Sequence, residues 1–182
     1  MKKLALTSLA STALLVASFS AQAGTFPSTY FDVTYNHFEW EPKGVDSFAT
    51  PAAGIALGFR GNPFFGLQFA AGTGTDEGSP SNLFPAASFR IDEYYSAYLV
   101  GTFADFERFS INGKIGYSKI YATKKYTGTS LKDKTAEESM SWGFDGKLKF
   151  TKNFALVVSY TNLYDKDDVQ ISGVGGGVEF VF

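Results

Sequence analysis

Apolar and polar residues alternate with a period of two along most of this chain. Such alternation indicates β-strands whose two faces meet different surroundings. It occurs in eight segments, each setting large apolar side chains against small or polar ones: residues 29–39, 50–60, 64–73, 89–103, 109–121, 138–150, 154–164 and 170–182. The sequence therefore predicts an all-β fold, and one closed antiparallel up-and-down barrel of eight strands is the simplest arrangement of these segments.

The connections between the segments distinguish the two ends of this barrel. Short turns at 61–63, 104–108 and 151–153 alternate with longer polar connections at 41–49, 74–88 and 123–137, and a short, strongly charged connection spans 165–168. In up-and-down order, all tight turns lie at one end and all longer loops at the other. Both chain termini are expected at the tight-turn end.

Composition excludes several classes of function. The chain has no cysteine and a single histidine, His37, so disulfides, thiol catalysis and cysteine- or histidine-based metal sites are not expected, and no cofactor is predicted. Lysine and arginine number 16 against 18 aspartates and glutamates, which gives no basic field for nucleic acid. An aromatic content of 17% and 19 glycines favour strands and tight turns.

The first residues have the pattern of a secretory leader. Lys2 and Lys3 precede an apolar stretch over 4–19, and Ala21-Gln22-Ala23 resembles a small-residue cleavage site. We therefore predict a cleaved signal peptide at 1–23 and a barrel domain at 24–182. A membrane-spanning anchor is the alternative, but the stretch is barely long enough and contains Ser and Thr.

The heights of the aromatic residues decide which barrel face meets lipid. On the apolar face, phenylalanines lie beside the tight turns, aliphatic residues in mid-strand, and Tyr and Trp towards the loops. This sorting predicts two aromatic belts around a lipid-facing band, whereas a soluble lipocalin-like barrel has no reason to sort rings by height. The predicted belt residues are Phe31, Tyr35, Phe59, Tyr95, Phe103, Phe109, Tyr117, Trp142, Phe150 and Tyr160.

Three motifs carry a resemblance to a known family. Tyr94-Tyr95-Ser96-Ala97-Tyr98-Leu99, Lys114-Ile115-Gly116-Tyr117-Ser118 and the ending Val178-Glu179-Phe180-Val181-Phe182 are similar to those of the small OmpA/OmpX-type outer-membrane β-barrels of Gram-negative bacteria. The resemblance implies a monomer in the cell outer membrane with both termini periplasmic. It also implies that Val178, Phe180 and Phe182 form the insertion signal.

The resemblance further implies particular partners. They are outer-membrane lipid and lipopolysaccharide, the barrel insertion machinery and periplasmic chaperones. The larger OmpA-like members carry a peptidoglycan-binding domain, which is not expected here because the sequence ends with its last strand.

The polar face of the strands is predicted to line the lumen. The charges on this face form either an ion path or a paired network that plugs a narrow barrel. They are Asp32, Asp145, Glu179, Arg60, Lys114, Lys147 and Lys149. Near-balance of charge favours the plug. Strand counting brings Lys114 near Asp145 and Arg60 near Asp32, with Glu179 close to the same end on the strand that adjoins the first. The predicted lumen network consists of Asp32, Arg60, Gln68, Lys114, Asp145, Lys147 and Glu179.

An enzymatic function has little support in the sequence. Some small outer-membrane barrels modify lipid A with a serine, a histidine and an acid, and His37 with Asp46 and Ser47 is the comparable set here. However, His37 has outward parity and Asp-Ser is an ordinary turn dipeptide. We therefore predict that the protein is not an enzyme.

The connection at 123–137 is the most charged of the predicted loops. It carries Lys124, Lys125, Lys132 and Lys134 together with acidic residues, so it is either a patch for host ligands or lipopolysaccharide phosphates or an ordinary solvated loop. We predict a structural or surface-interaction role through the extracellular loops. A narrow passive pore for small or apolar solutes is the alternative.

Overall fold

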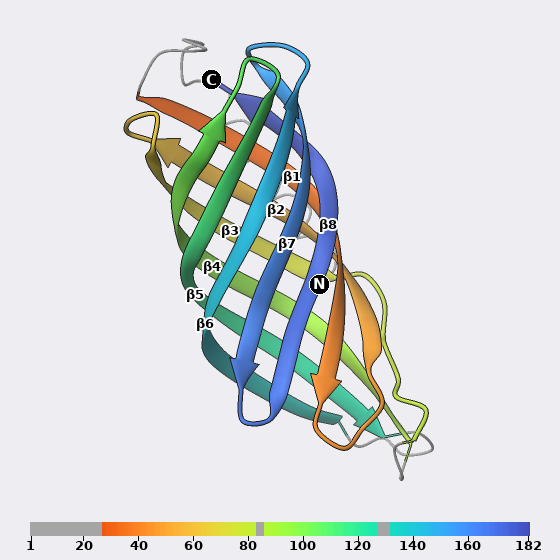
Figure 1. The fold of residues 1–182 in the computed structure, drawn as a ribbon. Coiled ribbons are helices and arrows are strands. Elements are labelled where there is room, and N and C mark those ends of the chain that lie inside the picture. Colours follow the sequence, from red (N-terminus) through yellow and green to blue (C-terminus); the bar gives the residue numbers. More distant parts are fainter. Residues whose placement is uncertain (1–26, 83–85, 127–131) are drawn as a thin grey trace, which may run out of the picture.

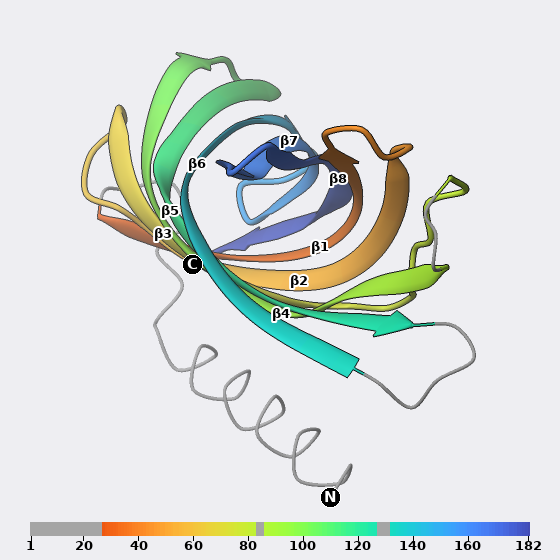
Figure 2. The ribbon, with the colours of Figure 1, turned by 90° about the horizontal axis from the view of Figure 1, so that it is seen from below.

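Eight antiparallel strands close into one barrel (Figure 1). The computed structural model describes residues 27–82, 86–126 and 132–182. Each strand pairs with its sequence neighbour, and β1 pairs with β8 to close the wall, as the view in Figure 2 shows. The predicted up-and-down barrel is confirmed. Its strands are β1 (Ser28–Pro42), β2 (Phe48–Arg60), β3 (Phe65–Gly74), β4 (Ala87–Asp105), β5 (Phe109–Tyr126), β6 (Lys132–Lys149), β7 (Phe154–Lys166) and β8 (Val169–Val181).

The tight turns lie together at one end, here called the turn end. The β2–β3 turn is closed by Asn62, whose Oδ1 accepts hydrogen bonds from the backbone N–H groups of Phe64 and Phe65 at 2.8 and 2.9 Å. The start of β1 lies at the same end, because the N–H of Phe182 donates to the carbonyl of Thr29 at 2.9 Å.

The opposite end, here called the loop end, contains one very short connection. Asp167 and Asp168 join β7 to β8 with φ values of 54° and 60°. A two-residue hairpin of the type I′ class needs positive φ at both positions, and aspartate tolerates this conformation better than most residues. Within the described residues, no helix is both long and apolar enough to cross a membrane.

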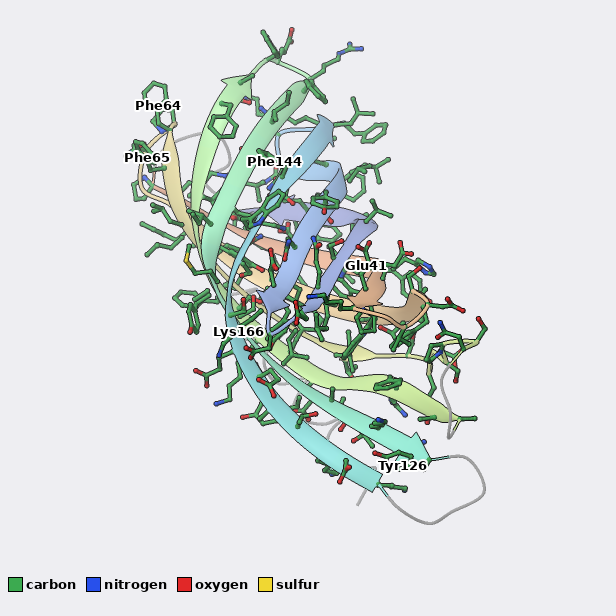
Figure 3. The ribbon with its side chains drawn as sticks, turned by 60° about the horizontal axis from the view of Figure 1, so that its bottom comes forward. Glu41, Phe64, Phe65, Tyr126, Phe144 and Lys166 are labelled. Carbon is green, nitrogen blue, oxygen red and sulfur yellow. The ribbon has the colours of Figure 1, made fainter. Side chains whose placement is uncertain are left out.

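The strand register turns the large apolar side chains outward. Leu57, Leu99 and Phe180 are 45%, 51% and 40% exposed, although they are apolar. Figure 3 shows Phe144 pointing away from the barrel wall. A barrel with its apolar residues sealed inside is excluded, and the outward band requires an apolar solvent.

Six of the eight strands are longer than the sequence predicted, and β5 and β6 differ most. The polar connection expected at 123–137 is mostly strand, because β5 runs to Tyr126 and β6 starts at Lys132. The β5–β6 ladder continues without interruption from Phe109↔Leu148 to Lys125↔Lys132. Polar residues remain in strands here because an antiparallel ladder needs backbone partners rather than an apolar face. In Figure 3 the far end of β5 at Tyr126 lies well away from the barrel.

The outward position of Leu99 generates a test of the lipid-facing band. Leu99→Arg is expected to lower the free energy of unfolding in lipid vesicles by about 2–4 kcal/mol, because a charged residue near the bilayer midplane is poorly solvated. The measurement is urea-induced unfolding followed by tryptophan fluorescence. Ala136→Arg, on the exposed outer face of β6 beyond the barrel, is the control. Equal losses in the two variants would contradict a lipid-facing Leu99.

Candidate functional site

A buried ionic cluster fills the lumen near the turn end. Glu179 is only 3% exposed. Its carboxylate accepts a hydrogen bond from Arg60 Nη2 at 3.0 Å and forms an ion pair with Lys147. Both cations also lie over the ring of Tyr30, with Arg60 Cζ 4.5 Å and Lys147 Nζ 4.6 Å from the ring centroid. β1, β2, β6 and β8 thus meet across the barrel through four side chains.

A second polar group lies further along the lumen. Lys114 Nζ is 2.9 Å from Asp145 Oδ1, so the structure brings together the two residues that strand counting placed near each other. Asp32 Oδ2 accepts a hydrogen bond from Gln68 Nε2 at 2.9 Å. All four side chains come from different strands, β5, β6, β1 and β3.

The structure specifies the partners of two of the predicted polar-face charges, Arg60 and Lys149. Arg60 bonds Glu179 rather than Asp32, because β8 carries Glu179 opposite Asp32 and its longer side chain reaches the guanidinium. Lys149 is not part of the lumen network. It lies at the rim of the turn end, where it pairs with Asp105.

The lumen carries three acidic and three basic side chains among the described residues. Glu179 pairs with Arg60 and Lys147, and Asp145 pairs with Lys114, whereas Asp32 is held by the Gln68 amide. Such pairing makes burial of ions tolerable in a protein interior. A cavity of about 50 Å³ remains beside them, with Asp32, Asn36 and Tyr94 in its lining. This volume suits a few water molecules. The charges belong to Asp32, Asp145, Glu179, Arg60, Lys114 and Lys147.

An apolar cluster fills the lumen towards the loop end. The indole of Trp40 stacks on Phe48 at 5.6 Å between centroids, and its Nε1 donates to Thr50 Oγ1 at 2.8 Å. Phe38 packs edge-on against Tyr94 at 5.8 Å. The full cluster is Phe38, Trp40, Phe48, Ala52, Ile91, Tyr94, Ile120, Leu163, Tyr164 and Ile171.

Sequence reasoning missed this cluster. Phe38 and Trp40 have the same parity as Asp32 and Asn36 on β1, so the alternation itself places them inside. The sequence feature that could have predicted the cluster is a change along the inner face of β1. Its residues are polar near the turn end and aromatic near the loop end. The interior therefore has two tiers, one ionic and one apolar.

The connections at the loop end are tied to one another. Lys43 forms an ion pair with Asp168 at 3.2 Å, which joins the β1–β2 connection to the β7–β8 turn. Glu77 accepts bonds from Lys125 and from Ser88 Oγ, so the β3–β4 connection is fixed to β5. The hydrogen bond from Lys125, with that from Ser88, holds the pKa of the Glu77 carboxyl below its ordinary value.

The residues of the lipid A-enzyme hypothesis do not form a site. His37 is exposed on the outer face of β1. Asp46 is engaged by another connection, since Asn82 Nδ2 donates to its Oδ1 at 2.9 Å and Ser81 Oγ donates to its other oxygen. Within the part of the chain that the structure describes, no hydrogen bond links His37, Asp46 and Ser47 to one another. The arrangement lacks the base–nucleophile contact that such chemistry needs.

The residues predicted as belts and insertion signal lie on the outer wall. Val178, Phe180 and Phe182 follow one another at the turn end of β8, and Phe180 packs against Phe154 at 5.4 Å. Phe31 and Tyr160 are half-buried by their neighbours. The exposed belt residues are Tyr35, Phe59, Tyr95, Phe103, Phe109, Tyr117, Trp142 and Phe150.

The protruding part of the sheet, residues 119–126 of β5 and 132–141 of β6, presents lysines on its outer face. Lys125 lies directly opposite Lys132, and Lys134 lies two residues further along β6, opposite Thr123. Lys124 has the other parity and lies over the rings of Phe89 and Tyr126 instead. We call Lys125, Lys132 and Lys134 the lysine face.

Comparison with known proteins identifies the architecture. A family model described as an outer membrane protein beta-barrel domain matches residues 9–182. The chain belongs to this outer-membrane β-barrel family. Membership places the protein in the outer membrane. A comparison of the sequence with curated proteins gave no match.

Solved structures share the fold at low sequence identity. Ail of Yersinia pestis, in a complex with the heparin analogue sucrose octasulfate, is 15% identical with a TM-score of 0.65, over 87% of this chain and 100% of that one. OprG of Pseudomonas aeruginosa is 10% identical with a TM-score of 0.60, over 90% and 99%. Neisserial surface protein A is 16% identical with a TM-score of 0.59, over 84% and 96%.

The lumen pairs generate a test of their energetic role. Lys114→Met is expected to lower the free energy of unfolding by about 3–5 kcal/mol, because it leaves the buried Asp145 carboxylate without its cation. Lys114→Met combined with Asp145→Leu should recover most of that loss. Lys43→Met, which breaks an exposed pair, should cost less than about 1 kcal/mol. A double variant less stable than Lys114→Met alone would contradict the pairing.

Proposed function

We propose that this protein is a surface-interaction protein of the outer membrane that binds anionic ligands through its lysine face. The barrel serves as the anchor, and the protruding β5–β6 sheet is the binding element. The observation that carries the proposal is the continuous β5–β6 ladder up to Lys125↔Lys132. It holds the lysines in a fixed array instead of leaving them on a mobile loop.

The electrostatics of this face favour an anion. Lys125 shares its charge with Glu77. Among the described residues, no carboxylate forms an ion pair with Lys132 or Lys134. Facing strands lie about 5 Å apart and alternate residues about 7 Å apart. Several ammonium groups at this spacing suit a ligand with multiple phosphate or sulfate groups, and a single carboxylate would engage only one of them.

One neighbour in fold offers a precedent for the ligand class. The structure of Ail with sucrose octasulfate shows a small barrel of this fold in complex with a heparin analogue. For the present chain, the corresponding ligands are sulfated host polysaccharides or the phosphates of lipopolysaccharide. The two sources share their chemistry, and sucrose octasulfate is a probe for both.

The alternative of a passive pore has less support. An open path through the barrel would have to pass both the cluster around Glu179 and the apolar cluster around Trp40. The remaining cavity of about 50 Å³ lies between these obstacles. We therefore propose a role outside the lumen. The dispersed positions of His37, Asp46 and Ser47 likewise support a function that is not enzymatic.

The proposed route of the protein to the outer membrane follows from its sequence alone. We propose that residues 1–23, which lie outside the described residues, are a cleaved signal peptide and that both termini are periplasmic. Val178, Phe180 and Phe182 would then be read by the barrel insertion machinery after delivery by periplasmic chaperones. A monomer embedded among outer-membrane lipid and lipopolysaccharide is the proposed final state.

The lysine face leads to a binding prediction. Replacing Lys125, Lys132 and Lys134 by glutamine should weaken binding of sucrose octasulfate by roughly tenfold or more, because each lost cation removes a charge-assisted contact. Affinity is measured by calorimetry on the protein in nanodiscs, at several salt concentrations. The matched control replaces Lys43, Lys152 and Lys166, which lie elsewhere on the surface. Equal effects of the two triple variants would overturn the proposal.

The filled lumen leads to a prediction on conductance. Wild-type protein in planar bilayers should show no steady open channel, because paired charges and packed aromatic rings occupy the barrel. Trp40→Ala combined with Phe48→Ala should by itself leave conductance low, since the ionic tier stays intact. Steady channels in the wild type would favour the pore.

A further inference from the structure

One acidic residue of the β3–β4 connection is held against the lysine face. Gly78 of this connection exchanges two backbone hydrogen bonds with Phe89 of β4, at 2.8 and 2.7 Å, and forms an antiparallel bridge with it. In an antiparallel bridge the residue before one partner faces the residue after the other, so Glu77 lies beside Arg90. Backbone pairing therefore brings the Glu77 carboxylate to β4.

Side chains from two strands meet at this carboxylate. Lys125 of β5 forms an ion pair with Glu77 Oε1, and Ser88 Oγ of β4 donates to Oε2 at 2.8 Å. Ser88 lies directly opposite Lys125 in the β4–β5 ladder, so the two donors share one face of the sheet. The hydrogen bonds from Lys125 and Ser88, together with the charge of Arg90, hold the pKa of the Glu77 carboxyl below its ordinary value. We call Ser88, Arg90 and Lys125 the anion niche.

Arg90 has donors that the carboxylate does not use. Its Nη2 donates to the carbonyl of Gly74 at 3.1 Å. Its Nε is buried, and within the part of the chain that the structure describes it has no hydrogen-bond acceptor. A guanidinium carries several N–H groups, and a sulfate or phosphate group offers more acceptor oxygens than a carboxylate. The anion niche therefore suits a sulfate or phosphate group better than the carboxylate it holds.

The backbone of the connection is held in place without the side chain of Glu77. The N–H of Thr75 donates to the carbonyl of Pro51 at 2.8 Å, and the bridge at Gly78 fixes the next turn of the chain. A Cβ atom added to Gly78 would lie only 2.4 Å from the carbonyl oxygen of Ala49, so the connection passes close against β2. The side chain of Glu77 can therefore leave the niche while its backbone stays.

The contact of Glu77 with Lys125 is weak enough for a ligand to replace. The two side chains are 31% and 38% exposed, and ion pairs at such exposure contribute little to stability. A ligand with several sulfate or phosphate groups can also contact Lys132 and Lys134 at the same time. Anionic groups joined in one molecule bind together more tightly than each would alone.

We propose that Glu77 occupies the binding position of one anionic group of the ligand, and that a sulfate or phosphate group displaces it from the anion niche. Glu77 is then an internal competitor, which excludes anions of single charge and yields to a multiply charged ligand. This inference rests on the proposed function and adds Ser88 and Arg90 to the contacts of the lysine face.

Glu77→Gln tests the competition, because it removes the charge and keeps the size of the side chain. The variant should bind sucrose octasulfate about threefold or more tightly than the wild type, by calorimetry on protein in nanodiscs. Asp46→Asn is the matched control, since Asp46 is an acid of the neighbouring connection that bonds Ser81 and Asn82. It should change the affinity by less than about twofold, because salt screens a distant charge. Equal gains in the two variants would overturn the proposal.

Combined variants locate the effect in the anion niche. In a Lys125→Gln background, Glu77→Gln should give much less gain, because the cation for which the carboxylate competes is absent. In a Glu77→Gln background, Arg90→Gln and Ser88→Ala should each weaken binding of sucrose octasulfate severalfold, since the ligand then contacts both residues. A full gain in the Lys125→Gln background, or unchanged affinity in both of the other double variants, would contradict displacement.

The outcomes separate this inference from the proposed function. Wild-type binding that depends on the lysine face but is not improved by Glu77→Gln would leave the anion proposal standing and overturn the role of Glu77. Binding by the Glu77→Gln variant without binding by the wild type would support the competition and overturn the proposed function of the wild-type face. Absence of binding in both proteins would overturn both.

Discussion

Backbone hydrogen bonding is the constraint on which this structure depends. In hydrocarbon no water can satisfy an N–H or C=O group, so a sheet must close on itself to cross a membrane. Here β1 meets β8 from Tyr30↔Val181 to Pro42↔Val169, and closure leaves the outer wall free to carry apolar residues. The interior then receives the polar face, and its charges have to be paired there. Beyond the membrane the constraint is relaxed, and only there does the β6–β7 ladder end.

The two tiers of the interior solve one packing problem with different chemistry. An eight-stranded barrel encloses space for side chains only. Near the turn end, this space is filled by Tyr30 with Arg60, Lys147 and Glu179, and the Glu179 carboxylate pairs with both cations. Near the loop end it is filled by aromatic and aliphatic side chains around Trp40. The apolar tier near the loop end resembles the core of a soluble sheet. It explains why β7 turns away from β6, because Leu163 and Tyr164 of β7 pack into it.

Sequence alternation was enough to predict the strands, their order and the outward face. Counting along strands also placed Lys114 near Asp145, because residues at equal heights on adjacent strands are direct neighbours. Counting placed Arg60 at the same end of the barrel as Asp32 and Glu179, but the carboxylate that it bonds depends on side-chain length and on β8 closing against β1. The strand ends beyond the barrel were missed because polar residues on both faces of β5 and β6 look like a loop. The β-bulge between Asn162 and Tyr164 of β7 is a backbone feature that alternation does not reveal.

The length of the β5–β6 hairpin has a consequence for the cell surface. Lys132 lies ten residues beyond Trp142, the last rung shared with β7, which corresponds to roughly 30 Å along an extended strand. Sugar chains crowd the region just above the bilayer, and a site at that level would be screened from large molecules. Here β5 is paired out to its end, with β4 on one side and β6 on the other, and this sheet carries its tip outward through the layer. Contact with a second cell or a soluble macromolecule therefore begins at the tip.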